Sequence, residues 1–168
     1  KGPLLATIEI RTRMNVPRRA VRDFTRRSRQ TCVLDIVSEV SLGRGRRCLD
    51  VQTRVTTRAR DHRLRAAFPS GVRCSAYQAL MPFDVVSRPV PKPSDPGWTE
   101  TVQMTDPQQG FVSVGQDGAG LAVVCPDAYE TEVRDKPSAT ILMTMLRSFY
   151  QYGNWSATRN FEDGPQNL

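Results

Sequence analysis

Apolar and polar residues alternate along the first half of the chain, and this alternation predicts β-strands. In residues 32–42 the apolar positions fall on one face of an extended segment; they are Cys32, Leu34, Ile36, Val40 and Leu42. After the basic glycine-containing turn at 43–47, the same period returns over residues 49–56, with Leu49, Val51, Thr53 and Val55 on the inner face. Because side chains point to opposite faces with a period of two, these runs predict half-buried strands joined as a hairpin.

The rest of the chain extends this pattern. Residues 4–17 form a β-type run that ends at Pro17, residues 18–30 form a charged connection with room for a helical turn, and residues 110–125 are predicted to be two strands joined by a tight turn at "QDGAG". In "RLRAAF" (63–68), Arg63 and Arg65 alternate with apolar residues, so we expect them on a solvated face. The apolar run 139–152 fits either a buried helix or a strand covered on both faces, and its context favours the strand.

This pattern predicts an all-β protein built as an antiparallel β-sandwich. At 168 residues the chain is long enough for one core, so we expect a single domain over residues 1–168. Four prolines in residues 88–97 predict an extended loop inside that domain. The chain does not start with Met, which suggests a piece of a longer polypeptide.

Charge and cysteine content narrow the possible functions. Residues 1–75 carry 17 Arg and 1 Lys against 6 acidic residues, a net charge of +12, whereas residues 76–168 have a net charge of −5. Because arginine outnumbers lysine throughout, the bias can reflect base composition; we expect a solvated basic face, and no nucleic-acid or membrane partner. Without C-x-x-C spacing, the four cysteines are expected to be reduced and mostly in the core; they are Cys32, Cys48, Cys74 and Cys125.

No convincing active site follows from the residues alone. His62 is the only histidine, and Asp61 beside it does not complete a metal site, so we expect a strand-end residue with a structural hydrogen bond. The glycines of "GQDGAG" precede a strand and not a helix, which indicates a turn and not a phosphate loop. The carboxylate pairs that a glycosidase would need have no recognisable motif here; the candidates are Glu130 with Glu132 and Glu162 with Asp163.

The order of segments nevertheless resembles the C-terminal β region of glycoside hydrolase family 38, the α-mannosidases, and most of all its bacterial α-mannosidase and mannosylglycerate hydrolase branch. The most specific matches are "DHRLRAAFPSG" (61–71), and "GLAVV" (120–124) followed by "YETEV" (129–133) and "MTMLRS" (143–148). The resemblance implies a galactose-mutarotase-like sandwich that packs under an N-terminal catalytic domain. It places the aspartate nucleophile, the acid/base carboxylate and a zinc ion in that domain, so we expect no catalytic residue, metal or cofactor in this chain.

On this basis Asp61, His62 and Arg63 are candidates for a domain interface or for the rim of a substrate cleft. The expected partners are the chain's own N-terminal catalytic domain and, through it, a mannose-containing saccharide, in the bacterial cytoplasm; an oligomer is left open. The alternative function is a carbohydrate-binding module whose aromatic side chains stack on sugar; the candidates are Trp98, Tyr150, Tyr152 and Trp155.

Overall fold

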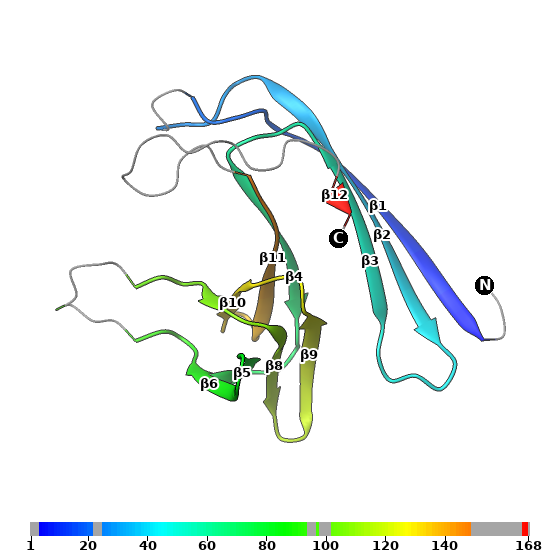
Figure 1. Cartoon of the computed structure of the whole chain (residues 1–168), viewed down its shortest axis with the longest axis vertical. Coiled ribbons are helices and arrows are strands. Elements are labelled where there is room, and N and C mark those ends of the chain that lie inside the picture. Colours follow the sequence, from blue (N-terminus) through cyan, green and yellow to red (C-terminus); the bar gives the residue numbers. More distant parts are fainter. Residues whose placement is uncertain (1–3, 22–24, 94–96, 98–101, 149–165, 168) are drawn as a thin grey trace. The chain divides into compact units, whose positions relative to one another are not determined.

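The computed structural model describes residues 4–21, 25–93, 97, 102–148 and 166–167 of the chain. The described residues form twelve strands and no helix, and therefore no helix that could cross a membrane (Figure 1). Antiparallel strands pair in all three sheets, so the predicted all-β class is confirmed. The chain divides into two compact units: a first unit of residues 1–63 and 147–168, and a second unit of residues 64–146.

One sheet of the first unit has the strand order β1-β2-β3-β12. Its strands are β1 (Leu5–Pro17), β2 (Thr31–Gly43), β3 (Asp50–Thr57) and β12 (Gln166–Asn167). The predicted hairpin of β2 and β3 is confirmed. Ile8 of β1 lies opposite Val40 of β2, and Val40 lies opposite Val51 of β3. The apolar positions of the three strands therefore share one face of the sheet.

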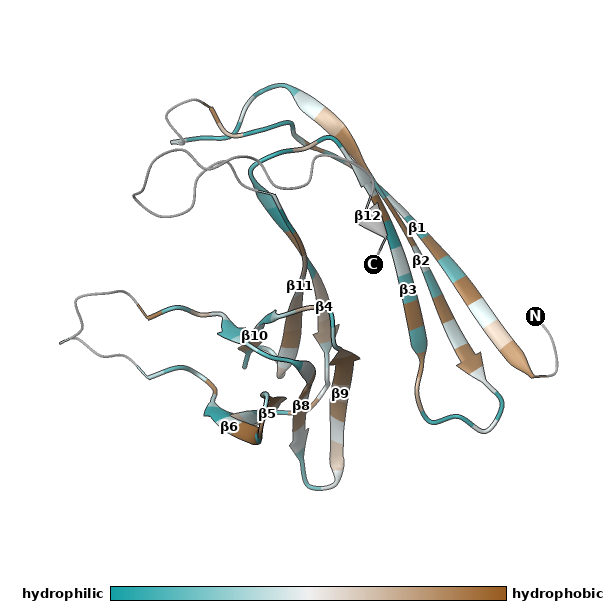
Figure 2. Ribbon diagram, in the orientation of Figure 1, coloured by the Kyte–Doolittle hydropathy of each residue, from teal (hydrophilic) through white to brown (hydrophobic). Residues whose placement is uncertain are grey.

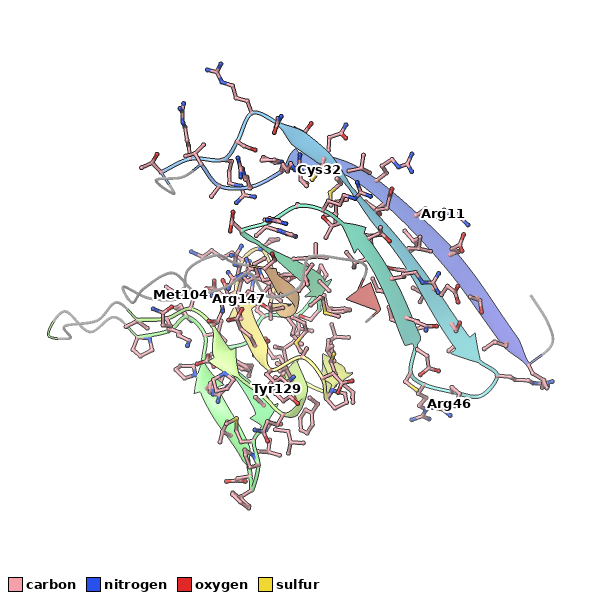
Figure 3. The ribbon with its side chains drawn as sticks, turned by 45° about the horizontal axis from the view of Figure 1, so that its top comes forward. Arg11, Cys32, Arg46, Met104, Tyr129 and Arg147 are labelled. Carbon is pink, nitrogen blue, oxygen red and sulfur yellow. The ribbon has the colours of Figure 1, made fainter. Side chains whose placement is uncertain are left out.

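The apolar face of this sheet is largely open among the described residues. Ile8 of β1 is 66% exposed and Val51 of β3 is 52% exposed, whereas Val55 near the other end of β3 is fully buried. In Figure 2 hydrophobic and hydrophilic bands alternate along all three strands. The opposite face is charged: Arg11, labelled on β1 in Figure 3, pairs with Glu9 at 2.6 Å.

The charged connection between β1 and β2 contains no helical turn in its described part, residues 18–21 and 25–30. Its backbone extends the hairpin instead: Arg18 N donates to the Gln30 carbonyl at 2.8 Å and Ser28 N donates to the Arg19 carbonyl at 2.9 Å. These hydrogen bonds join the two arms of the connection, and they use the same backbone N–H donors that a helix would need.

The second unit is built from two four-stranded sheets. One has the order β4-β11-β10-β7, with strands β4 (His62–Pro69), β11 (Thr140–Ser148), β10 (Glu130–Arg134) and β7 (Asp106–Pro107). The other has the order β6-β5-β8-β9, with strands β6 (Val85–Pro89), β5 (Ala76–Leu80), β8 (Gly110–Gln116) and β9 (Ala119–Cys125). The buried core draws residues from both sheets, among them Ala79, Val112, Val114, Ile141 and Met143.

Strand β11 confirms the interpretation of the last apolar run as a strand, because five of its nine residues are buried. The turn predicted at "QDGAG" is also confirmed: Asp117 (φ 54°) and Gly118 (φ 79°) connect β8 to β9, and two positive φ angles define a type I′ hairpin turn. The start of the proline-rich loop was predicted wrongly. Strand β6 includes Arg88 and Pro89, which is possible because β6 is an edge strand that does not need every N–H.

All four cysteines are free thiols, as expected. Cys74 and Cys125 pack against the core of the second unit, and Cys32 is half-buried. Cys48 is exposed beside Arg46 in the β2–β3 turn. It is therefore the exception to the expectation that most of the cysteines lie in the core.

Candidate domain-interface site

Asp61, His62 and Arg63 lie where the chain leaves β3 and enters β4. Asp61 has a positive φ of 56°, in the left-handed region that non-glycine residues rarely occupy, and it ends the irregular link after β3. His62 is the first residue of β4, which confirms its predicted place at a strand end. The left-handed residue turns the chain, and the strand then fixes the direction of the imidazole.

Asp61 is held by the connection between β1 and β2. Its Oδ2 accepts a hydrogen bond from the Ala20 N–H at 3.1 Å, and its backbone carbonyl accepts one from Arg27 Nη1. Arg27 Nη2 also donates to the Arg60 carbonyl at 3.0 Å. One guanidinium therefore bridges two consecutive carbonyls, and this clamp stabilises the unusual backbone of Asp61. No local sequence pattern singles out Arg27, which lies within a cluster of arginines.

Asp61 and His62 both have polar side-chain atoms that make no hydrogen bond within the described part of the chain. Asp61 Oδ1, His62 Nδ1 and His62 Nε2 are all buried, and none has a hydrogen-bond partner among the described residues. A buried polar atom without a partner costs about 1–3 kcal/mol, so three in adjacent residues are a feature that requires an explanation.

Electrostatics keep the imidazole neutral. Burial lowers the pKa of His62 below its ordinary 6.5, and the positive charge of Arg27 lowers it further; the nearby backbone of Arg60 and the charge of Asp61 raise it only in part. A neutral imidazole offers one donor nitrogen and one acceptor nitrogen. Together with Asp61 Oδ1, the site presents a donor and two acceptors within two residues.

Of the two arginines of β4, only Arg65 departs from the prediction of a solvated face. Arg63 is exposed but interacts with other groups, whereas Arg65 is half-buried and donates to Glu132 on β10. Glu132 also accepts from Arg134 Nε at 2.7 Å. Burial favours a higher pKa for Glu132, but the hydrogen bonds from Arg134 and Arg65 outweigh it and hold the pKa below the usual range. The prediction for Arg65 was wrong because its partner lies on a distant strand.

The remaining candidate groups do not form a catalytic or metal centre in the described part of the chain. Glu130 accepts from Thr144 Oγ1 at 2.6 Å and Glu132 is held between two arginines, so both carboxylates of β10 have structural partners. No group of three or more His, Cys, Asp and Glu side chains within the described ranges could hold a metal ion. The residues present therefore do not fit a zinc site. Several candidates lie outside the described residues: Trp98, Tyr150, Tyr152, Trp155, Glu162 and Asp163.

The described residues thus provide buried, unpaired hydrogen-bonding atoms at Asp61 and His62 and no acid/base pair. Comparisons with known proteins agree with the all-β fold. The chain is 23% identical to an α-mannosidase from Enterococcus faecalis V583, with a TM-score of 0.86 over 98% of this chain and 20% of that one. A second structure, a glycosyl hydrolase family 38 protein from Enterococcus faecalis, is 24% identical, with a TM-score of 0.81 and the same two coverages.

A curated relative supports the same relationship from sequence. A putative mannosylglycerate hydrolase of Halalkalibacterium halodurans is 29% identical over 129 residues, which are 77% of this chain and 14% of that protein. The chain therefore spans about a seventh of this relative and a fifth of the two solved chains. The model of the family described as "Glycosyl hydrolases family 38 C-terminal domain" matches residues 1–155. The chain belongs to the C-terminal domain family of the family 38 glycosyl hydrolases.

Proposed function

We propose that the chain is a non-catalytic β region of an α-mannosidase-type glycoside hydrolase and that it supports a catalytic domain elsewhere in a longer polypeptide. That polypeptide would hydrolyse α-mannosidic bonds with retention of configuration, and its nucleophile, acid/base group and zinc ion would lie outside this chain. The names of the relatives support the choice of enzyme class. The four free thiols and the bacterial relatives support a location in the bacterial cytoplasm.

One observation carries the proposal for the role of this chain. Asp61 Oδ1 and both ring nitrogens of His62 are buried without partners, while the described part of the chain offers no metal or acid/base cluster. Buried polar atoms are normally paired, so atoms left unpaired at a rigid clamped turn are suited to accept partners from another part of the polypeptide. Asp61, His62 and Arg63 would then contact the catalytic domain or the rim of its substrate cleft.

The first test concerns catalysis by the chain itself. The isolated chain is assayed with p-nitrophenyl α-mannoside, and its metal content is measured by mass spectrometry. We expect no turnover and far less than one zinc per chain. Turnover accompanied by one zinc per chain would contradict a supporting role.

The second test concerns the contact. In the longer polypeptide, His62→Ala should lower the melting temperature and increase proteolytic cleavage between domains, because the imidazole loses its partners there. Thr56→Ala, an exposed residue near the end of β3, is the matched control and should change neither. A rise in KM in the His62 variant would indicate the rim of the substrate cleft, and equal behaviour of the two variants would contradict the proposed contact.

No described residue favours the carbohydrate-binding alternative, because its four aromatic candidates lie outside the described part of the chain. It stays a prediction. Calorimetry with mannose and mannobiose tests it, since micromolar binding by the isolated chain would favour this alternative.

A further inference from the structure

The second unit contains an open cleft that plays no part in the proposed function. Its volume is about 940 Å³, near the upper end of the range of typical ligand sites. Four segments line it: the loop before β5, the residue that follows β6, the end of β8 and the β10–β11 turn. Loops gathered at the strand ends of a rigid sheet framework are a common place for binding sites.

The loops around the cleft are held in place by backbone hydrogen bonds. Ser70 N donates to the Ala139 carbonyl at 2.9 Å, and Ala139 N donates to the Val72 carbonyl at 2.8 Å. Val90 N donates to the Ser75 carbonyl at 2.7 Å. Ala139 and Val90 are buried members of the core, so these hydrogen bonds anchor the loops to the core of the unit. A site on such a base needs little reorganisation when a ligand binds.

The charged side chains of the cleft have no internal partners. Arg73 and Lys136 are exposed cations, and Asp135 between the two strands of the β10–β11 hairpin is half-buried. None of the three has a hydrogen bond or ion pair with any described residue, in contrast to the paired ions elsewhere in this unit, Arg65 with Glu132 and Lys92 with Asp106. The polar residues Ser75 and Gln116 also line the cleft.

We propose that this cleft binds a small anion rich in hydroxyl groups, a sugar acid or a sugar phosphate. Arg73 and Lys136 bind the anionic group, since both carry hydrogen-bond donors and a positive charge. Asp135 and Gln116 accept hydrogen bonds from hydroxyl groups of the same molecule. The common chemistry is one anionic group on a hydroxylated carbon chain.

The composition of the cleft disfavours other ligands. No aromatic side chain of the described residues lines it, so among these residues a neutral saccharide lacks the stacking surface that usually binds a sugar ring. The carboxylate of Asp135 repels a second anionic group, which disfavours a polyanion such as nucleic acid.

Calorimetry on the full chain with four probes tests the proposal. Gluconate and glucose 6-phosphate represent the two sources of the anion, and glucose and inorganic phosphate represent the hydroxyl groups and the anion alone. We expect at least one of the first two to bind about tenfold more tightly than inorganic phosphate, and glucose not to bind. Equal affinity for phosphate and for both larger probes would indicate an adventitious anion site only and would overturn the proposal.

Two sets of variants locate the binding. The double variant Arg73→Gln/Lys136→Gln should weaken binding at least about tenfold, the usual effect of losing a charge-assisted hydrogen bond. Arg44→Gln/Arg54→Gln removes the same charge from exposed positions of the first unit and should leave the affinity unchanged. Asp135→Asn should weaken binding of the hydroxylated anion without weakening that of phosphate. Equal losses in both double variants would overturn the proposal.

The cysteines give an independent readout. Cys74 lines the cleft and Cys48 lies exposed in the first unit, so a bound ligand should slow the alkylation of Cys74 by N-ethylmaleimide and leave that of Cys48 unchanged. Unchanged alkylation of Cys74 at a saturating concentration of the ligand would place the binding outside the cleft and overturn the proposal.

Discussion

Strand β1 of the first unit and strand β8 of the second have the same alternation of residue types but very different burial. In β8, Val112 and Val114 are buried, because the sheet that contains them contributes to a core shared with a second sheet. In β1 the apolar positions Ile8 and Ile10 are at least half exposed, and every residue of its first eleven is exposed. Alternation therefore specifies which face of a strand is apolar, and says nothing about what covers it.

The energetic consequence is that the two units depend on different sources of stability. The second unit buries its apolar side chains among its own residues. The sheet of the first unit depends for its stability on strand pairing wherever its apolar face is exposed. A three-stranded sheet gains independent stability only when its hydrophobic face is packed. Substitutions at equivalent types of position should therefore have unequal effects in the two units.

Core truncation should produce the largest difference. Ile141 is fully buried in the second unit, and Ile141→Ala should lower the free energy of unfolding by about 3 kcal/mol, because it leaves a cavity. Ile8→Ala should lower it by less than about 0.5 kcal/mol, because the side chain is already mostly in water. Urea unfolding followed by circular dichroism measures both. A loss at Ile8 close to that at Ile141 would show that the apolar face of β1 is covered in solution.

Ion pairs should give the next difference. Glu132→Gln should lower the free energy of unfolding by about 2 kcal/mol, because two guanidinium groups lose a partner whose side chain is only 10% exposed. Glu9→Gln on the charged face of the first unit should have no measurable effect, since water screens its pair with Arg11. The same urea titrations provide the measurement, and similar losses for the two variants would contradict the expected difference.

The Glu132 pair also has a defined pH dependence. The pKa of Glu132 is lower in the folded chain than its ordinary 4.5, so the carboxylate stabilises the fold at pH values above 4.5. That contribution is lost as the pH falls from 4.5 through the folded pKa. The stability difference between wild type and Glu132→Gln should therefore be constant from pH 7 to pH 5.5 and should shrink below pH 4.5; a constant difference down to pH 3 would contradict this assignment.

Backbone strain at turns should not distinguish the units. Gly45 in the β2–β3 turn (φ 75°) and Gly118 in the β8–β9 turn (φ 79°) both have left-handed backbones, and an added Cβ would meet nothing within 4 Å at either. Alanine at either site should cost about 1 kcal/mol, because only the backbone conformation is disfavoured. Thermal melts of Gly45→Ala and Gly118→Ala measure this cost, and a several-fold larger loss at one glycine would mean that its turn has further contacts.

The sequence predicted the strands well because their signal is local. The alternation in residues 32–42 and 49–56 and the Asp117-Gly118 turn each depend on residues a few positions apart, and the structure confirms them. The candidate site was predicted only as far as its position at the start of β4. Its clamp joins Arg27 to Asp61, 34 positions apart, and no local pattern selects Arg27 from the arginines around it.

The same reason explains the wrong environment predicted for Arg65. Its partner Glu132 is 67 positions away on another strand, so the alternation within β4 could not reveal the pair. The opposite net charges of the two halves of the chain were the one available signal, and they indicate attraction without naming partners. Register and pairing across sheets decide such contacts, and both depend on the complete fold.

The smallest expected effect concerns the imidazole of His62. Because burial and the charge of Arg27 lower its pKa, the folded ring takes up a proton only below the ordinary value of 6.5. The unfolded chain binds this proton first, so wild type should lose stability relative to His62→Gln as the pH falls from 6.5, and should show no difference of this origin above it. Titration of the ring by NMR should give a midpoint below 6.5. Arg27→Gln should raise that midpoint, whereas Arg13→Gln, which removes an exposed charge paired with Asp35, should leave it unchanged. A wild-type midpoint at or above 6.5 would mean that water reaches the ring nitrogens, and the unpaired atoms of Asp61 and His62 would then no longer support a domain contact.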